Sequence, residues 1–185
     1  DIKTVLLALA TAIGGGALIL KIKPYIAKRF NTWGHAIEYA SDGGFQQAHV
    51  LTYLASGGLF GVGIGNGFLK YVFASESDLV FGIVCEELGI IVGFVLIIAI
   101  LCLAIYTRDI ATRSRSTFYS ISACCAAGLF IVQMSLNVFG ATDILPLTGV
   151  TFPFVSAGGS SMISCWGLLA FIKAADERTY SQKRG

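Results

Sequence analysis

The uncharged stretch from Leu88 to Thr107 limits what this chain can fold into. It contains no Asp, Glu, Lys or Arg, and about 20 apolar residues are what an α-helix needs to cross the hydrocarbon core of a bilayer. In the whole chain 55% of the residues are hydrophobic and 13% are charged, whereas soluble domains carry about 25% charged residues. The sequence therefore predicts an all-α integral membrane protein and excludes the soluble fold classes. Its net charge of +2 gives no sign of nucleic-acid binding.

Four apolar segments are candidate membrane spans. They cover residues 4–20, 79–106, 118–140 and 159–172. Three consecutive glycines interrupt the first span, and Glu86 and Glu87 are the only charged residues in the second. The chain starts at Asp1, close to the first span, without the pattern of a cleavable signal peptide. We therefore expect residues 1–185 to be part of one longer polytopic membrane domain whose first half is missing.

Positive charges in the connections predict the orientation of these spans. Loop 107–117 contains three arginines and tail 173–185 contains four lysines and arginines, whereas loop 141–158 contains neither residue type. Because short cytoplasmic loops are enriched in Lys and Arg, we expect loop 107–117 and tail 173–185 to be cytoplasmic. Loops 21–78 and 141–158 then lie on the outer face, and Asp78 lies with them.

The large outer loop, 21–78, is too patterned to be a simple linker. Residues 45–55 predict a short helix with an apolar face made of Val50, Leu51 and Leu54. The sequence Ser56-Gly57-Gly58 ends this helix. Glycines then recur with a period of two between residues 61 and 67. This spacing does not match a dinucleotide-binding loop, so we expect a tight backbone turn near the lipid headgroups.

The second outer loop, 141–158, contains two prolines and an apolar middle, and it runs into Gly158-Gly159-Ser160-Ser161. A loop exposed to water would not be so apolar. We therefore expect a re-entrant segment before the last helix, with its irregular backbone lining a cavity rather than facing lipid. No spacing of His, Cys or acidic residues in the chain supports a metal site.

An acidic loop that ends at Asp78 leads directly into the second predicted span. A carboxylate at this boundary can meet both a polar sugar and a lipid tail. Two roles are open for Asp78. It can cap the following helix by accepting hydrogen bonds from free backbone amides. The positive end of that helix also favours the ionised carboxylate, which suits a general base or a cation ligand.

Glu86 and Glu87 would lie roughly 12 to 14 Å deeper than Asp78 in a continuous helix. Ionisable side chains at that depth are costly and are candidates for function. Adjacent residues point about 100° apart, so we expect the two not to face one partner together. Glu86 can face an inner cavity, paired with an upstream basic residue, or form a buried hydrogen bond to Gln133 or Asn137. The last two share one helix face, which is typical of interhelical hydrogen bonding.

Several short motifs follow one another in an order that resembles a known family. They are Gln46-Gln47-Ala48, the run Ser56 to Gly65, Ser77-Asp78-Leu79-Val80-Phe81, Glu86-Glu87-Leu88-Gly89, the run Leu145 to Val150, Pro153-Phe154-Val155-Ser156 and Gly158-Gly159-Ser160-Ser161. From Gln46 onward the chain resembles the C-terminal half of the SEDS family, the FtsW, RodA and SpoVE proteins of bacterial shape, elongation, division and sporulation. Each motif is weak alone, but the set is specific.

The resemblance implies a ten-helix fold, of which this chain would supply the last four helices and would be inactive by itself. It implies polymerisation of lipid II into peptidoglycan glycan strands at the bacterial cytoplasmic membrane, with an undecaprenyl pyrophosphate leaving group. It also implies a class B penicillin-binding protein as the transpeptidase partner, among other division or elongation proteins. Because the pyrophosphate leaving group is anionic, nearby cations or a divalent metal ion, Mg²⁺ or Mn²⁺, could offset its charge.

Asp78 aligns with the essential aspartate of the family and would act as a general base. The aligned residues before it lack the proline and histidine that the family commonly has there. The resemblance also points to substrate-binding candidates: Gln47, Ser56, Gly57, Gly58, Glu86, Gly158, Gly159, Ser160 and Ser161. The glycines would let the backbone approach the sugars, and the turn at 158–161 would shape the cavity that admits the polyprenyl tail.

Two other functions are open at the level of sequence. In a lipid II flippase the polar residues of the spans would line a path across the bilayer: Glu86, Glu87, Gln133 and Asn137. In a non-enzymatic scaffold the chain would recruit the transpeptidase, and Asp78 would be dispensable. Loss of glycan polymerisation after substitution of Asp78 separates the enzyme from both alternatives.

Overall fold

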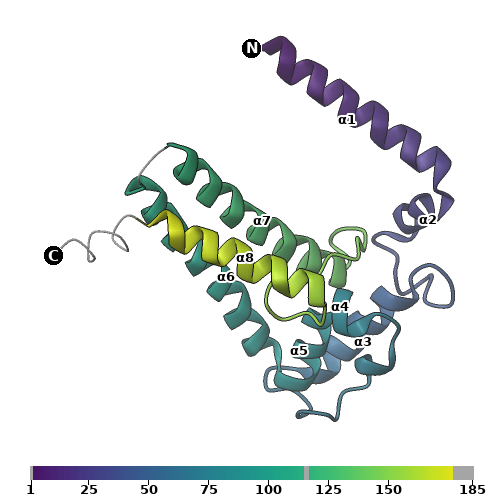
Figure 1. Cartoon of the computed structure of the whole chain (residues 1–185). Coiled ribbons are helices and arrows are strands. Elements are labelled where there is room, and N and C mark those ends of the chain that lie inside the picture. The colour runs from purple at the N-terminus through teal and green to yellow at the C-terminus, as the bar shows by residue number, and fades with distance from the viewer. Residues whose placement is uncertain (1, 115–116, 177–185) are drawn as a thin grey trace.

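The computed structural model describes residues 2–114 and 117–176 (Figure 1). Within these ranges the chain is almost entirely helical and has no strand, apart from an isolated bridge between Ser114 and Asp176. The helices are α1 (Ile2–Ile22), α2 (Pro24–Thr32), α3 (Phe45–Gly57), a 3₁₀ turn (Leu69–Tyr71), α4 (Ser75–Asp78), α5 (Val80–Leu88), α6 (Ile90–Thr112), α7 (Thr117–Ala141) and α8 (Gly159–Ala175).

The long helices α6, α7 and α8 lie side by side, and α8 packs against the other two (Figure 1). Small residues of α7, Ala123, Ala126 and Ala127, are buried at this contact, which lets the helix backbones approach closely. Both α6 and α7 are long and apolar enough to cross a membrane. The apolar helix α8 is shorter, with 17 residues.

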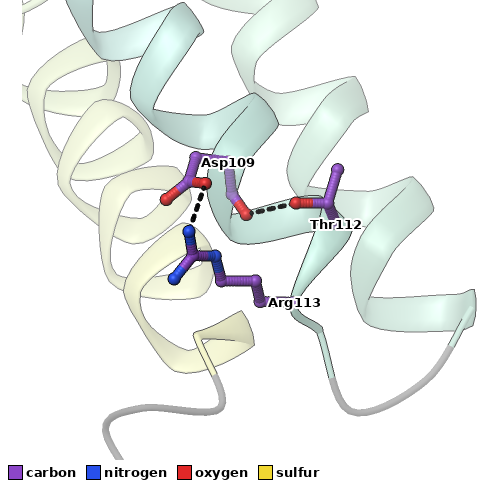
Figure 2. Close-up of polar contacts among 3 residues, drawn as sticks. All are labelled: Asp109, Thr112 and Arg113. Atoms are coloured by element: carbon purple, nitrogen blue, oxygen red, sulfur yellow. Dashed lines mark hydrogen bonds and ion pairs between the residues drawn. The ribbon is translucent and has the colours of Figure 1, made fainter.

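Polar contacts join Asp109, Thr112 and Arg113 at the C-terminal end of α6 (Figure 2). The Arg113 guanidinium lies 3.2 Å from the Asp109 carboxylate one turn earlier on α6. The Thr112 hydroxyl donates a hydrogen bond of 2.8 Å to the Asp109 carbonyl. An exposed pair at this spacing contributes only about 0.3–0.5 kcal/mol to stability. The bridge between Ser114 and Asp176 brings the ends of α6 and α8 together.

The stretch 79–106, predicted as one helix, is divided in the structure at Gly89, whose φ is 90° and ψ is 160°. A Cβ atom on this glycine would lie 2.1 Å from the Leu59 carbonyl oxygen. The helix therefore breaks where the backbones of Gly89 and Leu59 are in close contact. At a rise of 1.5 Å per residue, the 23 residues of α6 cover about 34 Å. The prediction of one continuous helix over residues 79–106 is therefore wrong, and α6 alone is long enough to cross a bilayer.

Helix α5 instead packs against α3 at the end of the bundle opposite Arg113 (Figure 1). Val50 from α3, Leu69 from the 3₁₀ turn and Phe81 and Cys85 from α5 are buried in the same apolar core. The helix predicted over residues 45–55 is therefore present as α3, and it forms the platform on which α5 rests.

The loop between α7 and α8, residues 142–158, folds back against the helices. Leu147 and Phe152 in its apolar middle are 6% and 2% exposed, and Phe152 stacks on Phe81 of α5 with ring centroids 6.4 Å apart. Burial of these side chains explains why the loop is apolar. By contrast, α1 lies apart from the bundle (Figure 1), and its described side chains are exposed.

Candidate functional site

Asp78 ends the single helical turn α4, which begins after Ala74 in the left-handed region (φ 58°, ψ 21°). A non-glycine residue there is strained, and such strain concentrates at functional sites. The chain then breaks at Leu79, and this residue, not Asp78, is the N-cap of α5. The structure shows no side-chain cap at that position, so the capping role considered for Asp78 is wrong.

Three consecutive backbone carbonyls of the Asp78 turn accept hydrogen bonds from distant parts of the chain. The amide of Ala157 donates to the Glu76 carbonyl over 2.9 Å. The Ser156 hydroxyl donates to the Ser77 carbonyl over 2.6 Å. The Asn137 side-chain amide donates to the Asp78 carbonyl over 2.9 Å. Since the last carbonyls of a helix have no partner within it, these bonds satisfy them and fix the turn.

The Asn137 side chain connects three elements. It is 1% exposed, and its Nδ2 also donates to the Val150 carbonyl over 2.7 Å. It therefore joins α7, the Asp78 turn and the α7–α8 loop. Its Oδ1 is buried without a hydrogen-bond partner among the described residues, and the same holds for Oε1 of Gln133 one turn earlier.

The Asp78 carboxylate itself is half-buried and forms no hydrogen bond or ion pair with any described residue. It lies against Gly149 of the α7–α8 loop, whose φ is +73°, and a Cβ atom there would be 3.1 Å from Asp78 Oδ2. Glycine thus leaves room beside the carboxylate. The result is an acceptor without a partner on a backbone that is held in place, which is the arrangement that a proton acceptor needs.

A polar hollow of about 360 Å³ opens beside the same turn. One cation, Lys70, stands at its wall, and its ammonium donates a hydrogen bond to the Gly65 carbonyl. The ammonium also lies 5.3 Å from the ring centroid of Tyr71. The hollow is lined by Lys70, Val72, Ala74, Ser75, Glu76, Ser77 and Ala157.

Glu86 and Glu87 hold the glycine-rich segment that follows α3. The buried Glu86 carboxylate accepts hydrogen bonds from the amides of Phe68 and Leu69 over 2.7 and 3.0 Å. The Glu87 carboxylate accepts one from the Gly65 amide over 3.0 Å. Both adjacent side chains thus contact one segment, contrary to expectation, because this segment wraps around the end of α5. Neither Gln133 nor Asn137 is the partner of Glu86.

The glycines of this segment allow its backbone to pack closely against the backbone of α5. A Cβ atom on Gly57 would lie 2.4 Å from the Cys85 carbonyl oxygen, and one on Gly61 would lie 2.2 Å from that of Glu87. The Gly58 carbonyl accepts a hydrogen bond from the Ile90 amide. These residues surround the end of α5, about 13 Å along the helix from its start next to Asp78. The structure therefore does not bring Gly57, Gly58 or the neighbouring Ser56 to the aspartate.

The other candidates divide between scaffold and site. The Gln47 side chain is 4% exposed and donates to the Gly140 carbonyl and to Asp143, which ties α3 to the end of α7. Residues 158–161 begin α8, directly after the Ala157 that contacts Glu76. Of these, the Ser161 hydroxyl lies 2.7 Å from that of Thr151. The start of α8 therefore lies beside the Asp78 turn, and substrate binding by residues 158–161 stays a prediction.

No individual role was predicted for Ser156 or Gly149, and Asn137 was predicted to bind Glu86 or to line a flippase path. Asn137 and Ser156 lie 59 and 79 residues from the carbonyls that they bind at the turn. The only sign in the sequence that Asn137 and Ser156 support the site is that each is a polar residue in an apolar stretch. Among the described residues, no group of three or more His, Cys, Asp or Glu side chains could hold a metal ion, so a divalent cation here stays a prediction from the resemblance.

The helical bundle, with two helices long and apolar enough to cross a membrane, defines a helical membrane protein with an open acidic turn at one end. Comparison with known proteins gives the family. A model of the FtsW/RodA/SpoVE cell cycle proteins matches residues 1–181, and the chain belongs to this family of membrane proteins.

Among its relatives, a probable peptidoglycan glycosyltransferase FtsW from Lactococcus lactis is 38% identical over 90% of this chain and 41% of its own length. A protein of the same description from Bacillus subtilis is 32% identical over 78% of this chain and 36% of its own length. The peptidoglycan glycosyltransferase RodA of Mycobacterium leprae is 29% identical over 91% of this chain and 36% of its own length. The chain thus spans about two fifths of the length of these curated relatives.

Proposed function

We propose that the protein containing this chain is a peptidoglycan glycosyltransferase that polymerises lipid II, and that Asp78 is its general base. Relatives that are similar over most of this chain are named as peptidoglycan glycosyltransferases or probable ones. The observation that carries the proposal is the Asp78 carboxylate, which has no partner among the described residues although three hydrogen bonds fix the turn behind it.

In the proposed reaction, a hydroxyl of the acceptor saccharide attacks C1 of the lipid-linked donor. Asp78 accepts the hydroxyl proton as the new C1–O bond forms. The bond between C1 and the pyrophosphate oxygen breaks with inversion, and the polyprenyl pyrophosphate leaves with the bonding electrons. A positioned base contributes about 10²–10⁴-fold to such a step. Lys70 stands at the wall of the adjacent hollow, where its charge would favour the anionic leaving group.

Asp78→Asn in the intact protein tests this assignment. We expect glycan polymerisation from lipid II to fall by about 10²-fold or more, because the amide cannot accept the proton. Asp109→Asn is the matched control, since that carboxylate pairs with the exposed Arg113 at the other end of the bundle (Figure 2). If Asp78→Asn polymerises lipid II at the same rate as the control, Asp78 is not the general base.

The rival functions find less support in the contacts. A flippase path needs Glu86, Glu87, Gln133 and Asn137 to line one route, but the two glutamates bind the glycine-rich segment and Asn137 binds the Asp78 turn. A pure scaffold gives no reason for an open carboxylate on a fixed turn. Recruitment of a class B penicillin-binding protein and other division or elongation proteins is compatible with the enzyme, and we propose it as a second role.

The proposed reaction also requires a particular orientation. We propose that the protein resides in the bacterial cytoplasmic membrane with the Asp78 turn on the outer face. Arg113 and the end of α8 would then face the cytoplasm. Figure 1 supports this arrangement, because α4 and the C-terminal end of α6 lie at opposite ends of the bundle.

A further inference from the structure

A mainly apolar pocket of about 480 Å³ lies between α2 and the α7–α8 loop. Its walls come from α2 and the residue that follows it, from α7 and from the first part of the loop. Apart from one arginine and one threonine, the lining side chains are aliphatic or aromatic. They are Ile26, Arg29, Phe30, Trp33, Leu136, Leu145, Pro146, Leu147 and Thr148.

Two side chains tie the walls of this pocket together. Arg29 Nη1 donates a hydrogen bond of 2.5 Å to the Leu147 carbonyl, and Trp33 Nε1 donates one of 3.0 Å to the Ile144 carbonyl. The Asp143 carboxylate accepts further bonds from the amides of Gly34 and Ala36. The segment from α2 to residue 36 is thus fastened to the loop, and the apolar pocket lies between the fastened walls.

Arg29 gives the pocket a charge without a counter-ion. A guanidinium has five N–H donors, and among the described residues only the Leu147 carbonyl accepts from it. In the part of the chain that the structure describes, no acidic residue lines the pocket. Because arginine pairs well with phosphate oxygens, an apolar pocket with an arginine that keeps unused N–H donors fits an amphiphile with an anionic phosphate head.

The same loop connects this pocket to the proposed base. Thr148 lines the pocket, and the next residue, Gly149, lies against the Asp78 carboxylate. Consecutive Cα atoms are 3.8 Å apart, so the pocket and the base share one short piece of backbone. A ligand whose chain fills the pocket would carry its head group toward Asp78.

We propose that this pocket binds the polyprenyl chain of a lipid-linked saccharide and that Arg29 binds its phosphate. This inference rests on the proposed glycosyl transfer and deepens it, because it assigns the site of the lipid anchor. It differs from the expectation that the turn at 158–161 admits the tail, since none of those residues lines the pocket.

Photocrosslinking of the intact protein in nanodiscs tests the proposal. The probe is a polyprenyl phosphate with a diazirine on its chain, and labelled peptides are mapped by mass spectrometry. We expect labels in residues 26–33 and 145–148, and competition by unlabelled polyprenyl phosphate but not by phosphatidylglycerol. Arg29→Gln should lower labelling about tenfold, the effect of losing one charge-assisted hydrogen bond. Arg113→Gln, which removes one exposed charge at the other end, should leave labelling unchanged.

Leu136→Trp provides a second variant, because the larger tryptophan side chain fills the pocket and leaves Arg29 in place. We expect this variant to abolish labelling in these peptides. Labels elsewhere, equal competition by phosphatidylglycerol, or undiminished labelling in both Arg29→Gln and Leu136→Trp would overturn the proposal. Labelling of the Asp78→Asn variant separates the two hypotheses. If wild type makes no glycan but wild type and Asp78→Asn are both labelled as expected, the proposed polymerase activity is wrong and the proposed lipid site is supported. If wild type polymerises lipid II without such labels, the lipid site alone fails.

Discussion

At the scale of single residues, the Asp78 carboxylate and the Asn137 side-chain amide have different roles at the same turn. Asp78 presents a carboxylate that no described residue binds, and Asn137 holds the carbonyl of that same residue and the carbonyl of Val150. A reacting group that is misplaced by about 1 Å can cost about 10²-fold in rate. We therefore regard Asn137 as a positioning residue that acts through Asp78.

Asn137→Ala should lower kcat for glycan polymerisation about tenfold or more with a smaller effect on KM, because the base loses its support while the sugar contacts remain. Gln133→Ala is the control, since that residue lies one turn away on the same face and its buried Oε1 has no partner among the described residues. Steady-state kinetics of the intact protein check this. Equal losses in the two variants, or a change in KM alone, would contradict positioning.

The sequence predicted Asp78 as a reacting group from its place in an acidic loop and from the resemblance. It could not predict the residues that support it. Ser156 is a small polar residue in an apolar loop, and only the folded chain places its hydroxyl between the Phe152 amide and the Ser77 carbonyl. Contacts over such sequence separations leave no local pattern.

At the scale of elements, the end of α5 organises the outer part of the fold. Its last carbonyls accept hydrogen bonds from the amides of Val62 and Gly63, while the carboxylates of Glu86 and Glu87 bind amides of the same segment. We interpret Glu86 as part of this framework rather than as a substrate ligand. The helix break at Gly89 completes it, because the glycine admits the Leu59 backbone.

Glu86→Gln should destabilise the intact protein by about 1–3 kcal/mol, because one buried amide hydrogen would face the new NH₂ group instead of an oxygen. Glu87→Gln is the matched change on a half-buried side chain with a single amide partner, and we expect a smaller loss. Thermal unfolding in detergent measures both. A Glu86→Gln variant as stable as wild type would show that the framework interpretation is incorrect.

Gly89→Ala should destabilise the protein severely, since its φ of 90° is strained for alanine and the new Cβ would meet the Leu59 backbone. Gly128→Ala, in the interior of α7 where a Cβ atom meets nothing within 4 Å, should instead be neutral or stabilise by up to about 1 kcal/mol. The yield of folded protein and its thermal unfolding distinguish the pair. Comparable stability of the two variants would argue against an obligatory break at residue 89.

At the scale of the whole molecule, the amino-acid pattern anticipated the all-helical fold and the approximate extents of α7 and α8. Their bounds differ from the predicted segments 118–140 and 159–172 by a few residues. It did not anticipate the break that separates α5 from α6. Apart from Glu86 and Glu87, apolar residues continue through residue 89, and the cause of the break is the Leu59 backbone, thirty residues away in the chain.

The arrangement of the bundle predicts opposite exposure for its two ends. In a variant without native cysteines, Thr148→Cys should react with an impermeant thiol reagent in intact cells. Arg113→Cys should react only after permeabilisation, because arginine-rich connections stay in the cytoplasm. Labelling of both positions from outside would contradict the orientation that the proposed reaction needs.

The central claim is that Asp78 takes the proton from the attacking sugar, and a single-turnover assay tests it most directly. Purified intact protein is mixed with excess lipid II analogue, and the first glycosidic bond is timed in wild type, Asp78→Asn and Asp109→Asn. The account predicts that bond formation slows by about 10²-fold or more in Asp78→Asn alone, with lipid II binding retained. Bond formation at the wild-type rate in a correctly folded Asp78→Asn protein would contradict it.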